Sequence, residues 1–218
     1  MGPRSSPPWK AILLMGPTGS GKTPLGDEIG RRGLGGRRCV HFDFGARLRA
    51  IASGLDAAEG LTEAEVGAVR ASLATGALFE DRDLPMIARI VERFAEGAKL
   101  GPEAGLVLNG LPRHREQAEG LAGILAVERI VLLEADAEVI RDRLRLDPGG
   151  DRAGRADDTV EAVRKRLGDY RERTLPLLEY YRRRGVPVAA IRVTAAMSAA
   201  EMYDVLSAMM NGKNGGRP

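Results

Sequence analysis

The sequence predicts a three-layer α/β fold, in which a central parallel sheet of about five strands carries helices on both faces. Five short apolar runs alternate with stretches whose apolar residues recur at helical spacing. Strands separated by helices join through right-handed crossovers, which make the strands parallel and cover both faces of the sheet. A glycine-rich segment at residues 16–23 joins the first apolar run to the first helical stretch. We therefore expect this segment at the carboxyl edge of the sheet, where such folds bind ligands.

The apolar runs predict the strands, and the amphipathic stretches predict the helices. We expect strands at residues 11–15, 39–42, 105–109, 129–133 and 188–193. We expect helices at residues 22–32, 63–73, 84–98, 115–126, 137–146, 159–184 and 199–210. Together they predict a single domain at residues 9–210, and the Pro/Ser segment 1–8 and the Gly/Asn segment 211–218 are expected to be flexible tails.

Two segments interrupt this alternation. Residues 43–81 form helical pieces before the third strand, which is a long excursion between two strands. Residues 147–158 are rich in turn formers and charge and lie between two strong helical patterns. Segments of the second kind are either solvated connectors or mobile flaps over a site.

Composition narrows the class of protein. With 44% hydrophobic residues among 218, the chain can build a sizeable core. The net charge is only +3, and acidic residues accompany the arginines almost everywhere, so no basic cluster predicts nucleic-acid binding. No apolar run approaches the roughly 20 residues needed to span a bilayer, and prolines stand where a signal peptide has its apolar region. We expect a cytoplasmic monomer that binds neither nucleic acid nor membranes.

The side chains most often used for metals and nucleophiles are scarce. Cys39 is the single cysteine, which excludes an internal disulfide and a Cys-rich zinc site, and we expect it to be a small buried hydrophobe. The two histidines have no matching Asp or Ser pattern, so neither is expected to be catalytic, and His114 is expected at the surface.

Residues 16–23 read Gly-Pro-Thr-Gly-Ser-Gly-Lys-Thr and match the phosphate-binding loop (P-loop) pattern G-x-x-x-x-G-K-[ST] in full. The glycines allow several backbone N–H groups to face one point, and the positive end of the next helix adds to that field. Lys22 carries an ammonium to the outer phosphates, and Thr23 offers a hydroxyl to the magnesium that accompanies a nucleoside triphosphate. Pro24 is tolerated because the first helical turn leaves its position without a hydrogen-bond partner. The residues expected to bind ATP here are Gly16, Gly19, Ser20, Gly21, Lys22, Thr23 and Pro24. The fold expected is that of the P-loop NTPases.

Further motifs follow the P-loop in order. They are Phe44-Gly-Ala-Arg-Leu-Arg49, Gly76-Ala-Leu-Phe79, Leu106-Val-Leu-Asn-Gly-Leu-Pro-Arg113 with Gln117, and Gly154-Arg-Ala-Asp-Asp158 with Arg166. In this order they resemble motifs of the adenylate kinase and nucleoside monophosphate kinase family, and the resemblance extends over residues 11–208. The third is the strongest match after the P-loop, because the family has Asp-Gly-Phe-Pro-Arg followed by Gln at the same spacing.

The resemblance implies an ATP- and magnesium-dependent transfer of a phosphoryl group to a nucleoside monophosphate, with ATP and AMP giving two ADP. It implies a helical monophosphate-binding insertion at about residues 43–81 and a short lid at about 147–157, a form that lacks zinc. The implied acceptor-binding residues are Phe44, Arg49, Ala77, Leu78, Phe79, Gly110, Arg113, Gln117, Arg155 and Arg166. On the donor side, Arg143 would lie against the adenine and Met197 would border it.

The chemistry of phosphoryl transfer independently favours these residue types. The reaction needs two anionic substrates held in line and a charge that is neutralised as it spreads over the moving group. A lysine, a magnesium ion and converging arginines supply the positive charge that neutralises it. The set expected to stabilise it is Lys22, Arg113, Arg155 and Arg166.

Several residues depart from the family pattern. Phe44 replaces a small residue beside the acceptor base, where it either stacks on a base or fills the pocket. Asn109 replaces an aspartate that organises the waters of magnesium, so it brings an amide oxygen without a charge. Asp147 occupies a place where a lid arginine is expected, so that Arg145 or Arg152 substitutes. These departures leave open a kinase with an acceptor other than AMP, or a nucleotide-binding module with weakened catalysis. The P-loop residues also suit a tRNA prenyl transferase, but the motifs around Arg113 and Arg155 and the modest charge disfavour that alternative.

Overall fold

The computed structural model describes residues 8–55, 60–150 and 159–212. Its centre is a five-stranded sheet in the order β2-β3-β1-β4-β5, and every neighbouring pair is parallel. The strands are β1 (Trp9–Met15), β2 (Cys39–Asp43), β3 (Gly105–Asn109), β4 (Leu125–Glu134) and β5 (Val188–Arg192). The predicted α/β class and the parallel sheet are confirmed.

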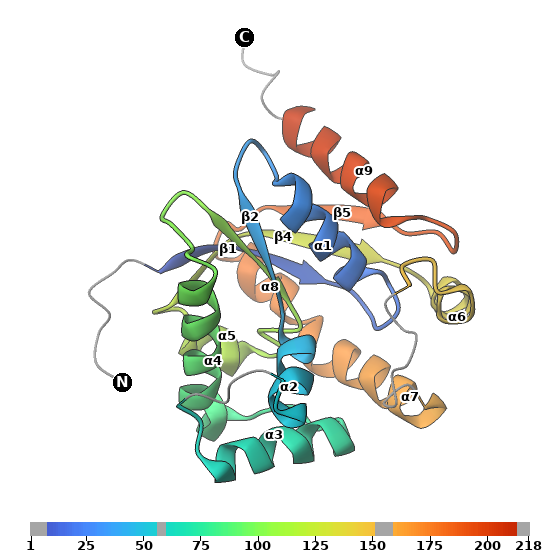
Figure 1. The fold of residues 1–218 in the computed structure, drawn as a ribbon. Helices are drawn as coiled ribbons and strands as arrows, with labels where there is room; N and C mark the ends of the chain where they lie inside the picture. Colours follow the sequence, from blue (N-terminus) through green and yellow to red (C-terminus); the bar gives the residue numbers. More distant parts are fainter. Residues whose placement is uncertain (1–7, 56–59, 151–158, 213–218) are drawn as a thin grey trace.

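Helices cover both faces of the sheet (Figure 1). On one face, α1 (Lys22–Arg32) and α9 (Ala199–Gly212) bury Leu25 and Leu206 against the strands. On the other, α4 (Leu84–Gly97), α5 (Arg115–Gly120) and α8 (Leu177–Arg182) bury residues such as Ile87. Successive side chains of β1 alternate between these two cores, because a strand points neighbouring residues to opposite faces. The chain therefore has the two apolar layers that a three-layer fold requires.

The segment between β2 and β3 is largely helical. Asp43 ends β2 and caps α2 (Phe44–Ser53), and Thr62 with Glu65 forms a capping box at the start of α3 (Glu63–Thr75). A 3-10 turn at Asp81–Asp83 then leads into α4. In Figure 1, α2 and α3 lie together at the bottom of the molecule, beyond the end of β2.

Two predicted helix boundaries are wrong. The helix predicted at 115–126 ends at Gly120, and β4 begins at Leu125, because Gly120 and Gly123 disfavour helix and Leu125 pairs with Trp9 of β1. The helix predicted at 159–184 divides into α7 (Val160–Asp169), a π-helical turn at Tyr170–Thr174 and α8. Pro176 has no amide hydrogen to continue the first helix.

The C-terminal boundary and one histidine also differ from expectation. Helix α9 continues to Gly212, two residues into the segment predicted to be a tail. His114 is buried rather than at the surface, because its ring fills the space under the Phe79 carbonyl, which lies 3.0 Å from Nε2. Cys39 is buried, as predicted.

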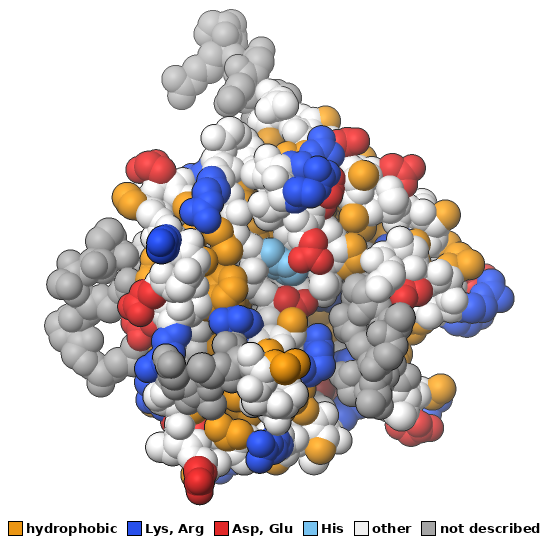
Figure 2. Space-filling model, in the orientation of Figure 1, with side chains coloured by type: hydrophobic (Ala, Val, Ile, Leu, Met, Phe, Trp, Pro, Cys, Tyr) orange, Lys and Arg blue, Asp and Glu red, His pale blue; other side chains and the backbone are white. Residues whose placement is uncertain are grey.

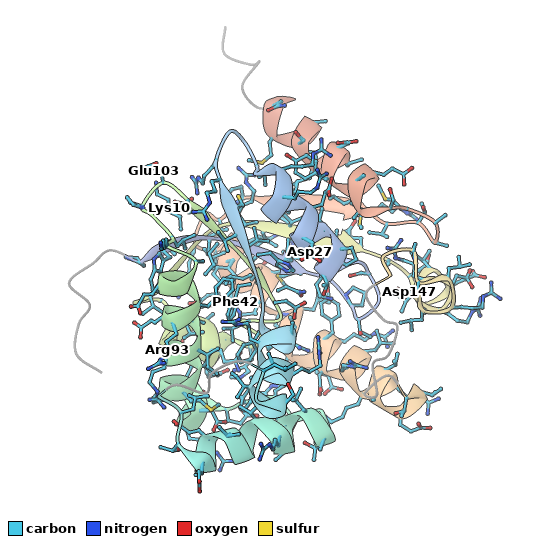
Figure 3. The ribbon with its side chains drawn as sticks, in the orientation of Figure 1. Lys10, Asp27, Phe42, Arg93, Glu103 and Asp147 are labelled. Carbon is cyan, nitrogen blue, oxygen red and sulfur yellow. The ribbon has the colours of Figure 1, made fainter. Side chains whose placement is uncertain are left out.

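The surface carries mixed charge. On the face shown in Figure 2, Lys and Arg side chains are interspersed with Asp and Glu side chains. In Figure 3, Lys10 and Glu103 lie at the same edge of the molecule, and their charged groups are 3.6 Å apart. Among the helices of the described residues, none is long and apolar enough to cross a membrane.

Candidate active site

The P-loop lies between β1 and α1, at the carboxyl edge of the sheet. Gly19 and Gly21 adopt φ angles of 82° and 97°, a region that side-chain-bearing residues rarely occupy. A Cβ atom on Gly21 would also lie 2.9 Å from the guanidinium of Arg143. Lys22 Nζ donates to the carbonyls of Gly16 and Pro17 at 2.7 and 2.8 Å, so its ammonium is held inside the curve of the loop.

Three side chains from three elements meet just beyond Lys22. Thr23 Oγ1 donates to Asp43 Oδ2 at 2.7 Å, and Asn109 Nδ2 donates to both of these oxygens at 2.9 and 2.8 Å. Thr23 lies in the first turn of α1, while Asp43 and Asn109 end neighbouring strands. Hydroxyl and carboxylate oxygens are the donors that magnesium takes, so the residues present fit that ion. Thr23 and Asn109 were predicted to serve the metal, and Asp43 was not.

One pocket joins this cluster to the acceptor residues expected from the sequence. Its lining includes Arg49, Ala77, Leu78, Gly110 and Arg113.

Two side chains predicted to surround the acceptor base, Phe44 and Gln117, already contact other parts of the protein. Phe44 also lines the pocket but is only 5% exposed, and its ring lies 5.9 Å from that of Phe79 in the core. Gln117 lines the pocket and is 1% exposed. Its amide donates to the Phe79 carbonyl at 2.8 Å and accepts from the Arg113 N–H at 2.8 Å. Both ends of the group expected to read the base therefore bond to the protein.

Two arginines converge opposite the P-loop. Arg113 and Arg166 both line the pocket, from the loop after β3 and from α7. Burial lowers the pKa of the Arg113 guanidinium, the charge of Asp169 opposes that shift, and the neighbouring cation Arg166 adds to it. Thr174, in the π-helical turn, accepts from Arg113 Nε at 3.3 Å and donates to its carbonyl at 2.9 Å. An arginine stays protonated in this environment, so the site concentrates positive charge where an anion is expected.

Arg143 is buried beside the P-loop. It is 3% exposed, and it comes from α6 (Ala137–Leu146). Its guanidinium donates to the carbonyls of Thr194 and Met197 at 2.8 Å each, and to that of Gly19 at 3.2 Å. The side chain thus ties α6 to the P-loop and to the segment after β5, and it also lines the pocket.

The remaining predicted residues take varied positions. Ser20, Pro24 and Met197 are not part of the pocket lining, although Ser20 is fully buried in the loop and its hydroxyl has no partner among the described residues. Asp147, the C-cap residue of α6, is labelled in Figure 3 and is among the residues that line the pocket. Arg145, one of the two proposed lid substitutes, is not among the lining residues. The other, Arg152, lies outside the described residues, as does Arg155.

Sequence reasoning missed Asp43, Tyr170 and Thr174, which all line the pocket. Asp43 had a usable signal, because it directly follows an apolar run and so belongs to the carboxyl edge of a strand. The two others had none, since the break in the helix after Asp169 was not predicted.

Comparisons with known proteins agree with this geometry. Residues 15–164 match the AAA domain family. An adenylate kinase from Parasynechococcus marenigrum (strain WH8102) is 33% identical over 184 residues, which cover 82% of this chain and 87% of that protein. One from Natronomonas pharaonis is 30% identical over 222 residues, with 92% and 96% covered. The chain belongs to the adenylate kinase family.

The family resemblance predicted from the motifs is therefore confirmed. Membership of the adenylate kinase family supports a phosphotransferase that uses the P-loop. The solved structure of a gluconokinase from Sinorhizobium meliloti 1021 is 20% identical in sequence to this chain. The match covers 96% of this chain and 95% of the gluconokinase chain, with a TM-score of 0.48.

Proposed function

We propose that the protein transfers a phosphoryl group from ATP to a nucleoside monophosphate, with AMP as the acceptor, so that ATP and AMP give two ADP. The observation that carries this proposal is a single pocket lined by the P-loop and by Arg49, Arg113 and Arg166. Two phosphate chains that meet in line need cations at both ends and at the point of transfer. The adenylate kinase relatives favour AMP.

Each part of the pocket has a role in this proposal. The P-loop holds the donor phosphates, and Lys22 follows the charge on the moving group. Arg49 and Arg113 hold the acceptor phosphate, and Arg166 with Arg155 neutralises the transferred group. Magnesium, when bound with ATP, neutralises phosphate charge beside Thr23. No general base is required, because the attacking atom is a phosphate oxygen.

The proposal also assigns the segments around the pocket. Residues 43–81, which contain α2 and α3, form the acceptor-binding insertion of a single kinase domain at residues 9–210. Residues 147–157 form the short lid, and their part beyond residue 150 lies outside the described residues. Asp147 and the two residues after it line the pocket, which supports a position for the start of this segment beside the nucleotides.

Two alternatives rest on specific observations. An acceptor other than AMP is favoured by Phe44, which fills space beside the predicted base, and by Gln117, whose amide is bonded to backbone at both ends. Weakened catalysis is favoured by Asn109, which brings no charge to the end of β3.

The test is product formation with a panel of acceptors. The purified protein is incubated with MgATP and each of AMP, CMP, UMP, GMP and their deoxy forms, and nucleoside diphosphates are quantified by anion-exchange chromatography. A Lys22→Ala variant purified in parallel measures the background from host kinases. ADP formed from AMP at many times that background supports the proposal. Turnover only with a pyrimidine refutes the AMP assignment, and no diphosphate from any acceptor refutes the kinase.

A further inference from the structure

The ends of β2 and β3 carry an acid and an amide in register. Asp43 and Asn109 are direct partners, the last pair of the β2–β3 ladder. Their side chains touch, with Asn109 Nδ2 2.8 Å from Asp43 Oδ2, and both line the nucleotide pocket. The family pattern has its acid on the strand of Asn109. In this chain the carboxylate is that of Asp43 on the neighbouring strand, and it lies beside Thr23 of the P-loop.

The hydrogen bonds fix how Thr23 presents its oxygen. Thr23 has one hydroxyl proton, and it donates this proton to Asp43 Oδ2 at 2.7 Å. Asn109 donates to the same hydroxyl oxygen and to the carboxylate, an arrangement that turns its NH2 group toward two acceptors. The remaining lone pair of Thr23 is therefore directed away from both partners and is free to face a cation.

The two oxygens of the Asp43 carboxylate have different partners. The oxygen that is not bonded to Thr23 accepts the Ala46 N–H at 2.8 Å and so caps α2. Within the described part of the chain, its hydrogen-bond partners are Thr23, Asn109 and Ala46, none of which is a cation. A cap needs only one oxygen, and capping alone does not explain why the second oxygen meets the P-loop threonine.

We propose that Asp43 is the positioning residue for magnesium in this protein, supplying from the end of β2 the negative charge that Asn109 lacks at the end of β3. Asp43 would orient Thr23 by accepting a hydrogen bond from its hydroxyl, and its negative charge would attract the ion. The inference rests on the proposed function only in assuming that MgATP binds at the P-loop. It implies that the loss of the acid at residue 109 does not by itself weaken catalysis.

The test measures how strongly magnesium and ATP binding are coupled. Titration calorimetry gives the Kd of ATP with magnesium and with EDTA, and the ratio of the two constants reports the ion alone. Asp43→Asn keeps an oxygen to cap α2 but removes the charge, and should lower this ratio by about 10- to 100-fold, the usual range for residues that orient metal ligands. The exchange variant Asp43→Asn/Asn109→Asp returns the charge on the other strand and should restore most of the ratio.

Controls separate the outcomes. Asp43→Ala removes both cap and charge, so loss of coupling in this variant with full coupling in Asp43→Asn would show that Asp43 is a cap only, and would overturn the proposal. A coupling ratio unchanged in Asp43→Asn, or not restored in the exchange variant, would overturn it as well. The binding measurement does not depend on an acceptor. Magnesium coupling that depends on Asp43 without any diphosphate product would therefore refute the proposed kinase and leave this inference standing.

Discussion

Replacing Arg143 by methionine should destabilise the protein strongly, because its buried guanidinium donates hydrogen bonds to several backbone carbonyls. The side chain is 3% exposed, and two of its hydrogen bonds to carbonyls are short, at 2.8 Å. A hydrogen bond to a charged group contributes about 1.5–3 kcal/mol, and the bonds near 3.2 and 3.4 Å add less. Methionine retains most of the apolar stem, so we expect a loss of about 3–5 kcal/mol in the free energy of unfolding.

The assay is urea denaturation followed by circular dichroism. With an m value of about 3 kcal/mol per M, this loss lowers the midpoint by about 1–1.7 M. Arg141→Met is the matched control, because Arg141 lies on the same helix with its side chain 72% exposed and should change stability by less than about 0.5 kcal/mol. Equal midpoints for the two variants would refute the reasoning that carbonyl contacts of Arg143 hold α6 in place.

Four other substitutions test individual residues. Lys22→Ala should lower turnover by orders of magnitude while the thermal melting curve stays unchanged; an unchanged rate would mean that the P-loop is not the catalytic phosphate site. Arg113→Ala should raise the acceptor KM or lower kcat with little change in the KM for ATP, as measured by steady-state kinetics. The hydrogen bonds from Arg173 lower the pKa of Glu80 below its ordinary value of 4.5. The ion pair therefore stabilises the fold above that value and is lost as the pH falls below it, so wild type and Glu80→Gln should differ by up to about 1 kcal/mol at pH 7 and converge in acid; a constant difference would contradict this. Lys99 adopts a φ of 49°, so Lys99→Gly should raise the free energy of unfolding by about 0.5–1 kcal/mol, and destabilisation would show that this backbone is not strained.

Local patterns predicted the strands and the P-loop well. The central strands β1 and β3 are short apolar runs with mostly buried side chains, and the predicted strand at residues 105–109 agrees with β3 at both ends. Such runs are legible because burial on both faces of a parallel sheet leaves few polar positions. The family follows from motifs of the same local kind, and the comparisons confirm it.

The features that failed depend on competition or on distant neighbours. Gly120 and Gly123 ended a helix whose apolar spacing continued to residue 126, and Pro176 divided another. His114 is buried because of the Phe79 carbonyl, which lies 35 residues away along the chain. Asp43 belongs to the site because β2 pairs with β3, which brings it next to Asn109. The roles assigned to the predicted site residues stay predictions, and that of Arg155 lies outside the described residues.

The contacts of Arg143 also bear on which parts of the molecule can move. This one side chain joins α6, the P-loop and the segment after β5, which are remote in sequence, into a single unit that includes the sheet. Across the pocket, α7 reaches α3 through Lys165 Nζ, which donates to the Gly76 carbonyl at 2.9 Å from an exposed position. A movement of α3 relative to α7 would therefore break fewer of these hydrogen bonds than a movement around Arg143. We expect the unit joined by Arg143 to stay rigid and α3 to move relative to it.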